Sequence, residues 1–200
     1  MLRIGLTGGI ASGKSTVSAM VRDRDYQVLD ADAIARELLE PGQPAYDEAV
    51  RSFGKGIVRP GGSIDRTKLA EIVFSDPLQL RQLNQILHPR IREITENFFA
   101  ALSHPGGPDL AFEDAALILE AGLKDKFDRV VVCWCHPEQQ LERLLQRGMS
   151  AEDARRRIAA QMPIDQKRKL ADEVIDCSGT MRETERQVEW LLEKLKKAAA

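Results

Sequence analysis

Apolar residues along the chain follow two alternating patterns. Four short apolar runs have the length and composition of buried strands: residues 2–7, 27–29, 110–112 and 129–135. Between them, apolar residues recur at helical spacing, as at residues 14 to about 24, where Val17, Met20 and Val21 share one face. Strands that alternate with helices are typical of a parallel sheet covered on both faces. The pattern therefore predicts an α/β fold.

One long segment, about residues 37–103, departs from this alternation. A break at residues 41–44 opens it, and the pattern from there on is helical without a clear strand. Proline in a first turn predicts that one helix begins at Ser75-Asp76-Pro77. The pair His88-Pro89 predicts the junction of two helices, because the residue before a proline disfavours the helical conformation. The segment is therefore predicted to be a helical insertion.

A second helical segment is predicted at residues 136–166. Pro137 begins a helix, Gly148 ends it, and residues 150–153 resemble a capping box with Asp in place of Glu. Residues 143–169 hold eight basic and three acidic side chains, so this stretch carries a charge of +5 (8 − 3) in a chain of −2. Such a run is either a solvated helix face or a lid that closes over phosphates, and charge alone does not separate the two.

The composition is that of a single folded domain. The chain has 200 residues, of which 43% are hydrophobic and 30% charged, which is enough for a full core. A net charge of −2 gives no general attraction to nucleic acid, and no apolar run reaches the roughly 18 residues that span a bilayer. A glycine-rich stretch with a lysine interrupts any signal-peptide pattern near the first residue. We expect a cytoplasmic protein without nucleic-acid or membrane partners.

Three cysteines are too few for a disulfide framework. Cys133 and Cys135 are two residues apart in an apolar strand, so they face the same side of it, while Cys177 lies far along the chain. With no matching Cys or His pair elsewhere, we expect buried structural thiols. A metal cluster of the C-x-C-H type, completed by His136, is the alternative.

The clearest chemical motif is GGIASGKS at residues 8–15, which fits the P-loop pattern G-x-x-x-x-G-K-[ST]. A predicted strand precedes it and a predicted helix follows it, as a phosphate-binding loop requires. Lys14 would contact the β- and γ-phosphates, and the Ser15 hydroxyl would bind Mg²⁺. The alternative is a glycine-rich turn that binds nothing.

Further motifs follow the P-loop in order, among them Asp30-Ala31-Asp32, Ile64-Asp65-Arg66, His88-Pro89, Leu117-Ile118-Leu119-Glu120, Arg143 with Gln161, and residues 171–176. Together they resemble the dephospho-CoA kinases, P-loop kinases that phosphorylate the ribose 3′-hydroxyl of dephospho-CoA in the last step of coenzyme A synthesis. The resemblance implies a three-layer α/β/α P-loop fold with a parallel five-stranded sheet. Its expected parts are a core at residues 1–36, 104–135 and 167–200, a CoA-binding insertion at about 37–103 and a lid at about 136–166.

The resemblance also implies the ligands. ATP and Mg²⁺ would be the cofactors, dephospho-CoA the acceptor, and the protein a monomer or weak homo-oligomer. The implied nucleotide-binding residues are Gly8, Gly9, Ala11, Ser12, Gly13, Lys14, Ser15, Thr16 and Arg143.

Two aspartates are candidates for the chemistry. Asp32 follows the carboxyl end of the second strand, the edge at which open α/β sheets bind ligands, and is the candidate base for the acceptor hydroxyl. A helix N-cap is the alternative for Asp30 or Asp32. Asp114, at a predicted strand end, would hold Mg²⁺ through water, or it is simply a polar strand end.

Basic residues complete the expected site. Arg143 resembles the family's nucleotide-contacting arginine and would place positive charge over the transferring phosphoryl group, as a catalytic residue beside Lys14. Arg147, one turn later, would share that role or face water. Arg66 and His88 lie in the insertion that the resemblance assigns to the CoA moiety, and each would contact substrate or serve packing and capping alone.

Three positions depart from the family pattern. Ala11 stands where the family commonly has Gly, at a variable position of the general P-loop motif. Ala116 replaces the proline of a Pro-Leu-Leu-x-Glu element but keeps the carboxylate of Glu120. Cys177 replaces the asparagine of an Asn-x-Gly element, which removes a side-chain contact to adenine and leaves backbone contacts open.

Three other functions fit parts of the chain. A nucleoside monophosphate kinase, or another small-metabolite kinase, shares the core and lid and differs in the insertion. A GTP-binding switch would need a guanine-specifying N-K-x-D, which the chain lacks. A nucleotide-binding scaffold without turnover would need Lys14 and tolerate the loss of Asp32.

Overall fold

The computed structural model describes residues 1–199, with every side chain in this range except that of Phe74. The chain divides into two compact units. The sheet unit comprises Met1–Asp30 and the described residues from Phe98 onward, and the helical unit comprises Ala31–Asn97. The chain passes from one unit to the other after Asp30 and again after Asn97, and the second crossing falls inside one long helix.

A parallel sheet of five strands is the centre of the sheet unit, which confirms the predicted fold class. The strands are β1 (Leu2–Gly8), β2 (Gln27–Asp30), β3 (Leu110–Asp114), β4 (Arg129–Trp134) and β5 (Glu173–Asp176), in the spatial order β2-β3-β1-β4-β5. The chain leaves the central strand β1, passes over β3 and pairs β2 on its far side. The switch in strand order beside β1 is where parallel sheets bind ligands, at the carboxyl ends of the strands.

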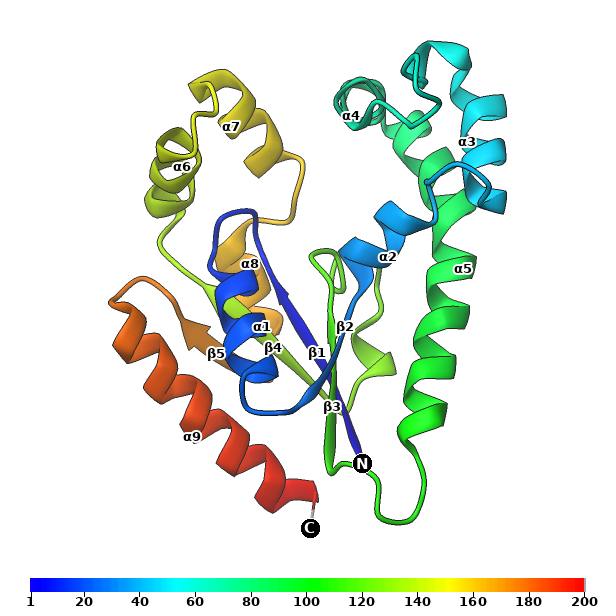
Figure 1. Cartoon of the computed structure of the whole chain (residues 1–200). Coiled ribbons are helices and arrows are strands. Elements are labelled where there is room, and N and C mark those ends of the chain that lie inside the picture. Colours follow the sequence, from blue (N-terminus) through cyan, green and yellow to red (C-terminus); the bar gives the residue numbers. More distant parts are fainter. Residues whose placement is uncertain (200) are drawn as a thin grey trace. The chain divides into compact units, whose positions relative to one another are not determined.

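Helices cover both faces of this sheet, as the predicted three layers require (Figure 1). On one face, α1 (Lys14–Arg22) and α9 (Met181–Ala199) pack Val17 and Val188 onto buried residues of the strands. On the other face, α8 (Ile164–Leu170) and the segment around the 3-10 helix η2 (Lys124–Lys126) pack with Trp134 into a second apolar cluster. β1 is buried from both sides, so the loop that follows it leaves a rigid strand.

Two further helices of the sheet unit follow β4 and precede α8 along the chain. They are α6 (Pro137–Gln146) and α7 (Ala151–Ala159), joined at Gly148, which has φ 81°. The Ser150 hydroxyl caps α7 by accepting a hydrogen bond of 3.1 Å from the Asp153 N–H. The Asp153 carboxylate pairs with Arg156, so the predicted reciprocal half of the capping box is replaced by an ion pair within the helix.

The helical unit is built from α2 (Ala31–Glu37), α3 (Pro44–Phe53), the 3-10 helix η1 (Lys55–Ile57), α4 (Arg66–Ser75) and most of α5 (Pro77–Leu102). As predicted, α5 begins at Pro77, and the Asp76 carboxylate accepts a 2.8 Å hydrogen bond from the Leu78 N–H. Its apolar cluster gathers buried residues from α3, η1, α4 and α5, such as Ala49 and Ile57, together with Leu39 after α2, and the partly buried Ala35 of α2 packs against it.

The predicted helix junction at His88-Pro89 is wrong, because α5 continues through Pro89. Proline removes one helical hydrogen bond and crowds the carbonyl four residues earlier. Packing offsets this loss, since Ile86 and Leu87 before the proline and Ile91 after it all contact the same apolar cluster. The Arg90 side chain adds a 2.7 Å hydrogen bond to the Ile86 carbonyl beside the interruption.

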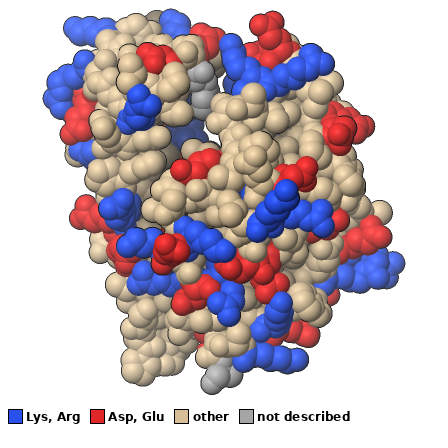
Figure 2. All heavy atoms as spheres, turned by 180° about the vertical axis from the view of Figure 1, so that it is seen from behind, with Lys and Arg blue, Asp and Glu red and all other residues tan. Residues whose placement is uncertain are grey.

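Charges of both signs are mixed on the molecular surface. Figure 2 shows Lys and Arg side chains interspersed with Asp and Glu on the face seen from behind, in keeping with the net charge of −2. Among the described residues, no helix has the length and apolar character that a membrane span needs.

Candidate functional site

The loop after β1 has the backbone of a phosphate-binding loop. Ala11 and Gly13 both have positive φ, 58° and 107°, and the helix α1 begins directly after Gly13. A side chain on Gly13 would also collide with Cys177, since its Cβ would lie 2.8 Å from the Cβ of that residue. The loop thus needs glycine here, and it presents the N-terminus of α1, which attracts anions, at the carboxyl edge of the sheet.

Ala11 is one of the positions at which the chain departs from the family pattern. Its left-handed backbone carries no steric penalty in glycine, whereas an L-residue such as alanine is strained there by roughly 1–2 kcal/mol. A hydrogen bond stabilises this strained conformation, because the Ala11 carbonyl accepts a 3.1 Å hydrogen bond from Arg143. The loop therefore keeps its shape with alanine at this position.

Lys14 forms an ion pair with Asp114 at the end of β3. The Lys14 side chain is 15% exposed and the Asp114 side chain 4%, so the carboxylate is almost fully buried and the ammonium is reachable. The register of the sheet fixes this approach, because Asp114 lies opposite Leu6 of β1 and Asp30 of β2. A phosphate bound by the loop would compete with Asp114 for the ammonium group.

Ser15 and Asp114 are the residues of this unit that could hold Mg²⁺. Ser15 is exposed in the first turn of α1, and Asp114 offers a carboxylate at the neighbouring strand end. Mg²⁺ prefers oxygen ligands and usually keeps several waters beside one or two protein groups, so two such residues fit the ion. Within residues 1–199, no three His, Cys, Asp or Glu side chains gather closely enough to form a protein-only metal site.

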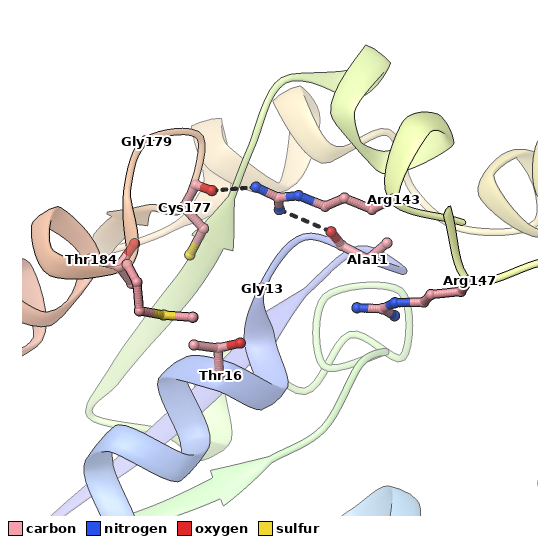
Figure 3. Close-up of a pocket in the computed structure, with 9 residues that line it drawn as sticks. Ala11, Gly13, Thr16, Arg143, Arg147, Cys177, Gly179 and Thr184 are labelled. Atoms are coloured by element: carbon pink, nitrogen blue, oxygen red, sulfur yellow. Dashed lines mark hydrogen bonds between the residues drawn. The ribbon is translucent and has the colours of Figure 1, made fainter. Parts of the chain in front are cut away.

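A cavity of about 210 Å³ opens beside the loop (Figure 3). Its lining combines the loop, the start of α1, the end of α6, the segment after β5 and the start of α9: Ala11, Gly13, Thr16, Arg143, Arg147, Cys177, Gly179, Met181 and Thr184. Backbone and small side chains form much of this wall, and two arginines bring positive charge to it. The cavity is thus suited to the base and sugar of a nucleotide whose phosphates lie on the loop.

Arg143 bridges two sides of this cavity. One guanidinium nitrogen donates to the Ala11 carbonyl at 3.1 Å and the other to the Cys177 carbonyl at 2.6 Å (Figure 3). Arg147 extends from the end of α6 toward the same cavity. The Cys177 backbone thus contributes the contact to Arg143, although the side chain differs from the family's asparagine.

The cysteines are buried and free, as predicted. Burial raises the pKa of Cys133 well above its ordinary value, and that of Cys135 to about 11. A hydrogen bond from the Cys133 thiol lowers the pKa of Cys177. Because the described residues contain no group of three metal-binding side chains, the alternative of a C-x-C-H metal cluster with His136 is wrong.

Two glutamines hold the loop at Ile10. The Ile10 N–H donates to the Gln161 side-chain oxygen at 2.7 Å, and the Ile10 carbonyl accepts from the Gln140 amide at 2.6 Å. Gln161 belongs to the motifs that resemble the dephospho-CoA kinases. No motif in the sequence marks Gln140. The segment after β4 therefore contacts the loop through uncharged side chains as well as through Arg143.

Lys167 is the residue near the loop whose surroundings the sequence predicted least well. It belongs to the basic run, which predicted either a solvated face or a lid, yet its side chain is 0% exposed. It lies in α8 and pairs with Glu120 at 2.7 Å. Charge pattern alone could not find this pair, because the two residues are far apart in the sequence.

The remaining predicted residues belong to the helical unit. Asp32 lies in the first turn of α2, two residues after the end of β2. Arg66 is exposed and pairs with Glu40 at 2.6 Å. His88 is half-buried in α5, and burial lowers its pKa, with the positive charge of Arg92 lowering it further. The sheet unit thus brings together the loop, Lys14, Ser15, Asp114 and Arg143, whereas Asp32, Arg66 and His88 belong to the helical unit.

Comparisons with known proteins show which family the chain resembles over most of its length. The family described as "Dephospho-CoA kinase" matches residues 2–183. A dephospho-CoA kinase from Symbiobacterium thermophilum is 46% identical over 187 residues, covering 93% of this chain and 78% of that protein.

Two solved structures have similar folds. The protein TT1252 from Thermus thermophilus has a TM-score of 0.81 and 35% identity, covering 97% of each chain. A dephospho-CoA kinase from Campylobacter jejuni has a TM-score of 0.70 and 26% identity, covering 99% of this chain and 98% of that one. By sequence, by fold and by its phosphate-binding loop, the chain belongs to the dephospho-CoA kinase family.

Proposed function

We propose that this protein transfers the γ-phosphoryl group of ATP to the ribose 3′-hydroxyl of dephospho-CoA, giving coenzyme A and ADP. The observation that carries the proposal is the ion pair between Lys14 and Asp114 at the end of a P-loop, in a chain of the dephospho-CoA kinase family. This arrangement supplies a cation for the transferring phosphoryl group and a carboxylate at the neighbouring strand end. Positioning and charge neutralisation of this kind are the main tasks of a phosphoryl-transfer site.

The nucleotide would bind along the loop and the cavity beside it. Backbone N–H groups from Gly8 to Thr16 would surround the β-phosphate and its neighbours, with Lys14 on the β- and γ-phosphates. The base would enter the cavity, whose wall includes Arg143 and Cys177. Mg²⁺, held by Ser15 and through water by Asp114, would neutralise charge on the phosphates.

Asp32 would accept the proton of the acceptor hydroxyl. It follows Asp30, which lies opposite Asp114 in the sheet register. Since consecutive Cα atoms are about 3.8 Å apart, the Cα atom of Asp32 lies within about 8 Å of that of Asp30. In a loose transition state the base is needed late, when the hydroxyl has become acidic.

The helical insertion at about residues 37–103 would bind dephospho-CoA. Arg66 could exchange its exposed partner Glu40 for a substrate phosphate, because a surface ion pair of this kind is weak. His88, with a lowered pKa, would act as a neutral hydrogen-bonding group near neutral pH. We further propose a cytoplasmic enzyme that is a monomer or weak homo-oligomer, without nucleic-acid or membrane partners.

The direct test is ADP release from ATP and Mg²⁺ with dephospho-CoA, CMP, AMP or no acceptor, with Lys14→Ala as the blank. We expect turnover with dephospho-CoA alone. Turnover confined to CMP or AMP would keep the P-loop kinase and replace the acceptor. If no acceptor gave more ADP than the blank, the proposal of a kinase would be wrong.

A further inference from the structure

Lys167 is a buried lysine whose ammonium group contacts backbone carbonyls and a carboxylate. Its side chain is 0% exposed. The ammonium group donates to the Gly8 carbonyl at 3.2 Å and the Ala116 carbonyl at 2.7 Å, and it pairs with Glu120 at 2.7 Å. Because a buried charge is costly unless it is paired and hydrogen-bonded, these contacts account for its position in the core.

The two carbonyls belong to the segments that carry the reacting charges. Gly8 is the last residue of β1 and directly precedes the rest of the P-loop. Ala116 follows Asp114, the partner of Lys14, by two residues, and its carbonyl accepts a second hydrogen bond of 3.1 Å from the Thr7 hydroxyl. The ammonium group of Lys167 therefore joins the start of the P-loop to the segment that follows β3.

Glu120 extends this connection toward the loop between α7 and α8. Its carboxylate, which balances the lysine charge, also accepts a 3.1 Å hydrogen bond from the Met162 N–H. The neighbouring residue, Gln161, accepts the 2.7 Å hydrogen bond from the Ile10 N–H. The contacts of Lys167, Glu120 and Gln161 thus fasten the same segment to the P-loop at two points.

We propose that Lys167 is a positioning residue for phosphoryl transfer. It sets the spacing between Lys14 on the P-loop and Asp114 at the end of β3, and its own ammonium group does not touch the nucleotide. Such a role follows from the contacts above, because the two carbonyls belong to the segments that carry Lys14 and Asp114. The proposal rests on the proposed function, since it assigns the effect to the phosphoryl-transfer step.

The test compares Lys167→Met with Lys169→Met, a matched change at an exposed position of the same helix. Hydrogen–deuterium exchange without any ligand reports local order, and steady-state kinetics with ATP and dephospho-CoA report function. In Lys167→Met we expect exchange at residues 9–13 and 115–120 to be about tenfold faster, with α9 unchanged. We expect kcat to fall by about 10- to 100-fold, because small misplacements of reacting groups have effects of this size.

The KM for ATP should change by less than about threefold in Lys167→Met. Because a loss of folded protein would also lower the apparent kcat at unchanged KM, kcat is calculated per folded protein, and unchanged exchange in α9 shows that the folded fraction is retained. Lys169→Met should match the wild type in every readout. Unchanged exchange at both segments, or faster exchange with an unchanged kcat, would overturn the positioning role. If the wild type itself fails to phosphorylate dephospho-CoA, the proposed function is wrong, and exchange at the two segments still decides whether Lys167 orders them.

A second variant covers the case in which Lys167→Met does not fold. Glu120→Gln keeps the shape and the hydrogen-bonding oxygen but removes the charge that balances Lys167. We expect the same two segments to exchange at least about threefold faster, with kcat lowered and the KM for ATP retained. A folded Glu120→Gln protein with wild-type exchange and kcat would overturn the proposal.

Discussion

Two lysines lie at the carboxyl edge of the sheet, and their surroundings differ. Lys14, in the first turn of α1, is 15% exposed and pairs with a carboxylate that a phosphate could displace. Lys167, in α8, is 0% exposed, and its oxygen partners include two backbone carbonyls, which a ligand cannot displace. Lys14 can therefore exchange its partner for a ligand, whereas Lys167 is bound to the framework.

The difference shows that position alone does not assign a role to a lysine near a phosphate-binding loop. The exposed fraction of the ammonium group and the kind of oxygen it contacts distinguish a ligand-binding lysine from one that orders the loop. Variants that remove either charge should then have different effects on turnover and stability.

The largest effect is expected for Lys14→Ala. Removal of the cation that contacts the transferring phosphoryl group should lower kcat/KM by at least about 1000-fold, which is about 4 kcal/mol of transition-state stabilisation. The measurement is ADP release with dephospho-CoA as acceptor. Turnover close to the wild-type rate in a folded variant would remove Lys14 from the site.

Asp32→Asn tests whether catalysis needs a general base, which neither Lys14 nor Lys167 supplies. Loss of a general base typically lowers the rate by about 100- to 10,000-fold, and we expect kcat to fall within this range. The Kd for ATP, measured by calorimetry, should stay within about threefold of the wild type because the base acts on the acceptor. An unchanged kcat would show that Asp32 is not the base.

Asp114→Asn changes the partner of Lys14 while keeping its shape. We expect kcat to fall by about 100-fold and the Mg²⁺ concentration for half-maximal rate to rise, because a neutral amide is a poorer partner for the ion. A titration of Mg²⁺ at saturating ATP measures both quantities. An unchanged Mg²⁺ requirement would leave Asp114 as a partner of Lys14 alone.

Lys167→Met should have the smallest of these effects on turnover, and it should also lower the free energy of unfolding. Breaking a buried ion pair typically costs about 3–5 kcal/mol, and the 21% exposure of the Glu120 side chain places our expectation near 2–3 kcal/mol in the free energy of unfolding. Denaturant unfolding measures it. Lys169→Met should stay within about 0.5 kcal/mol of the wild type. Equal stabilities of the two variants would contradict the contrast between the lysines.

Much of the sheet unit was predictable because its signals are local. Short apolar runs mark the strands, and GGIASGKS marks the loop between β1 and α1. The start of α5 was equally clear, since Asp76 and Pro77 are adjacent and cap the helix themselves. Each of these features depends on residues within one turn or one strand.

Features that depend on distant residues were harder to predict. Pro89 predicted the end of a helix, but α5 continues through it because apolar residues on both sides of the proline pack into one cluster. Lys167 looked like part of a solvated charge run, because the glutamate that allows its burial is at position 120. Gln140, which holds Ile10, has no spacing that distinguishes it from other polar residues of a helix.

The proposed function depends on dephospho-CoA being the acceptor. The most direct measurement is identification of the product. Dephospho-CoA is incubated with ATP, Mg²⁺ and the wild-type protein, and the product is analysed by mass spectrometry and phosphorus NMR. We predict a phosphate monoester at the ribose 3′-hydroxyl that does not form with Lys14→Ala. Unchanged dephospho-CoA in the presence of active protein that phosphorylates AMP or CMP would contradict the proposed function.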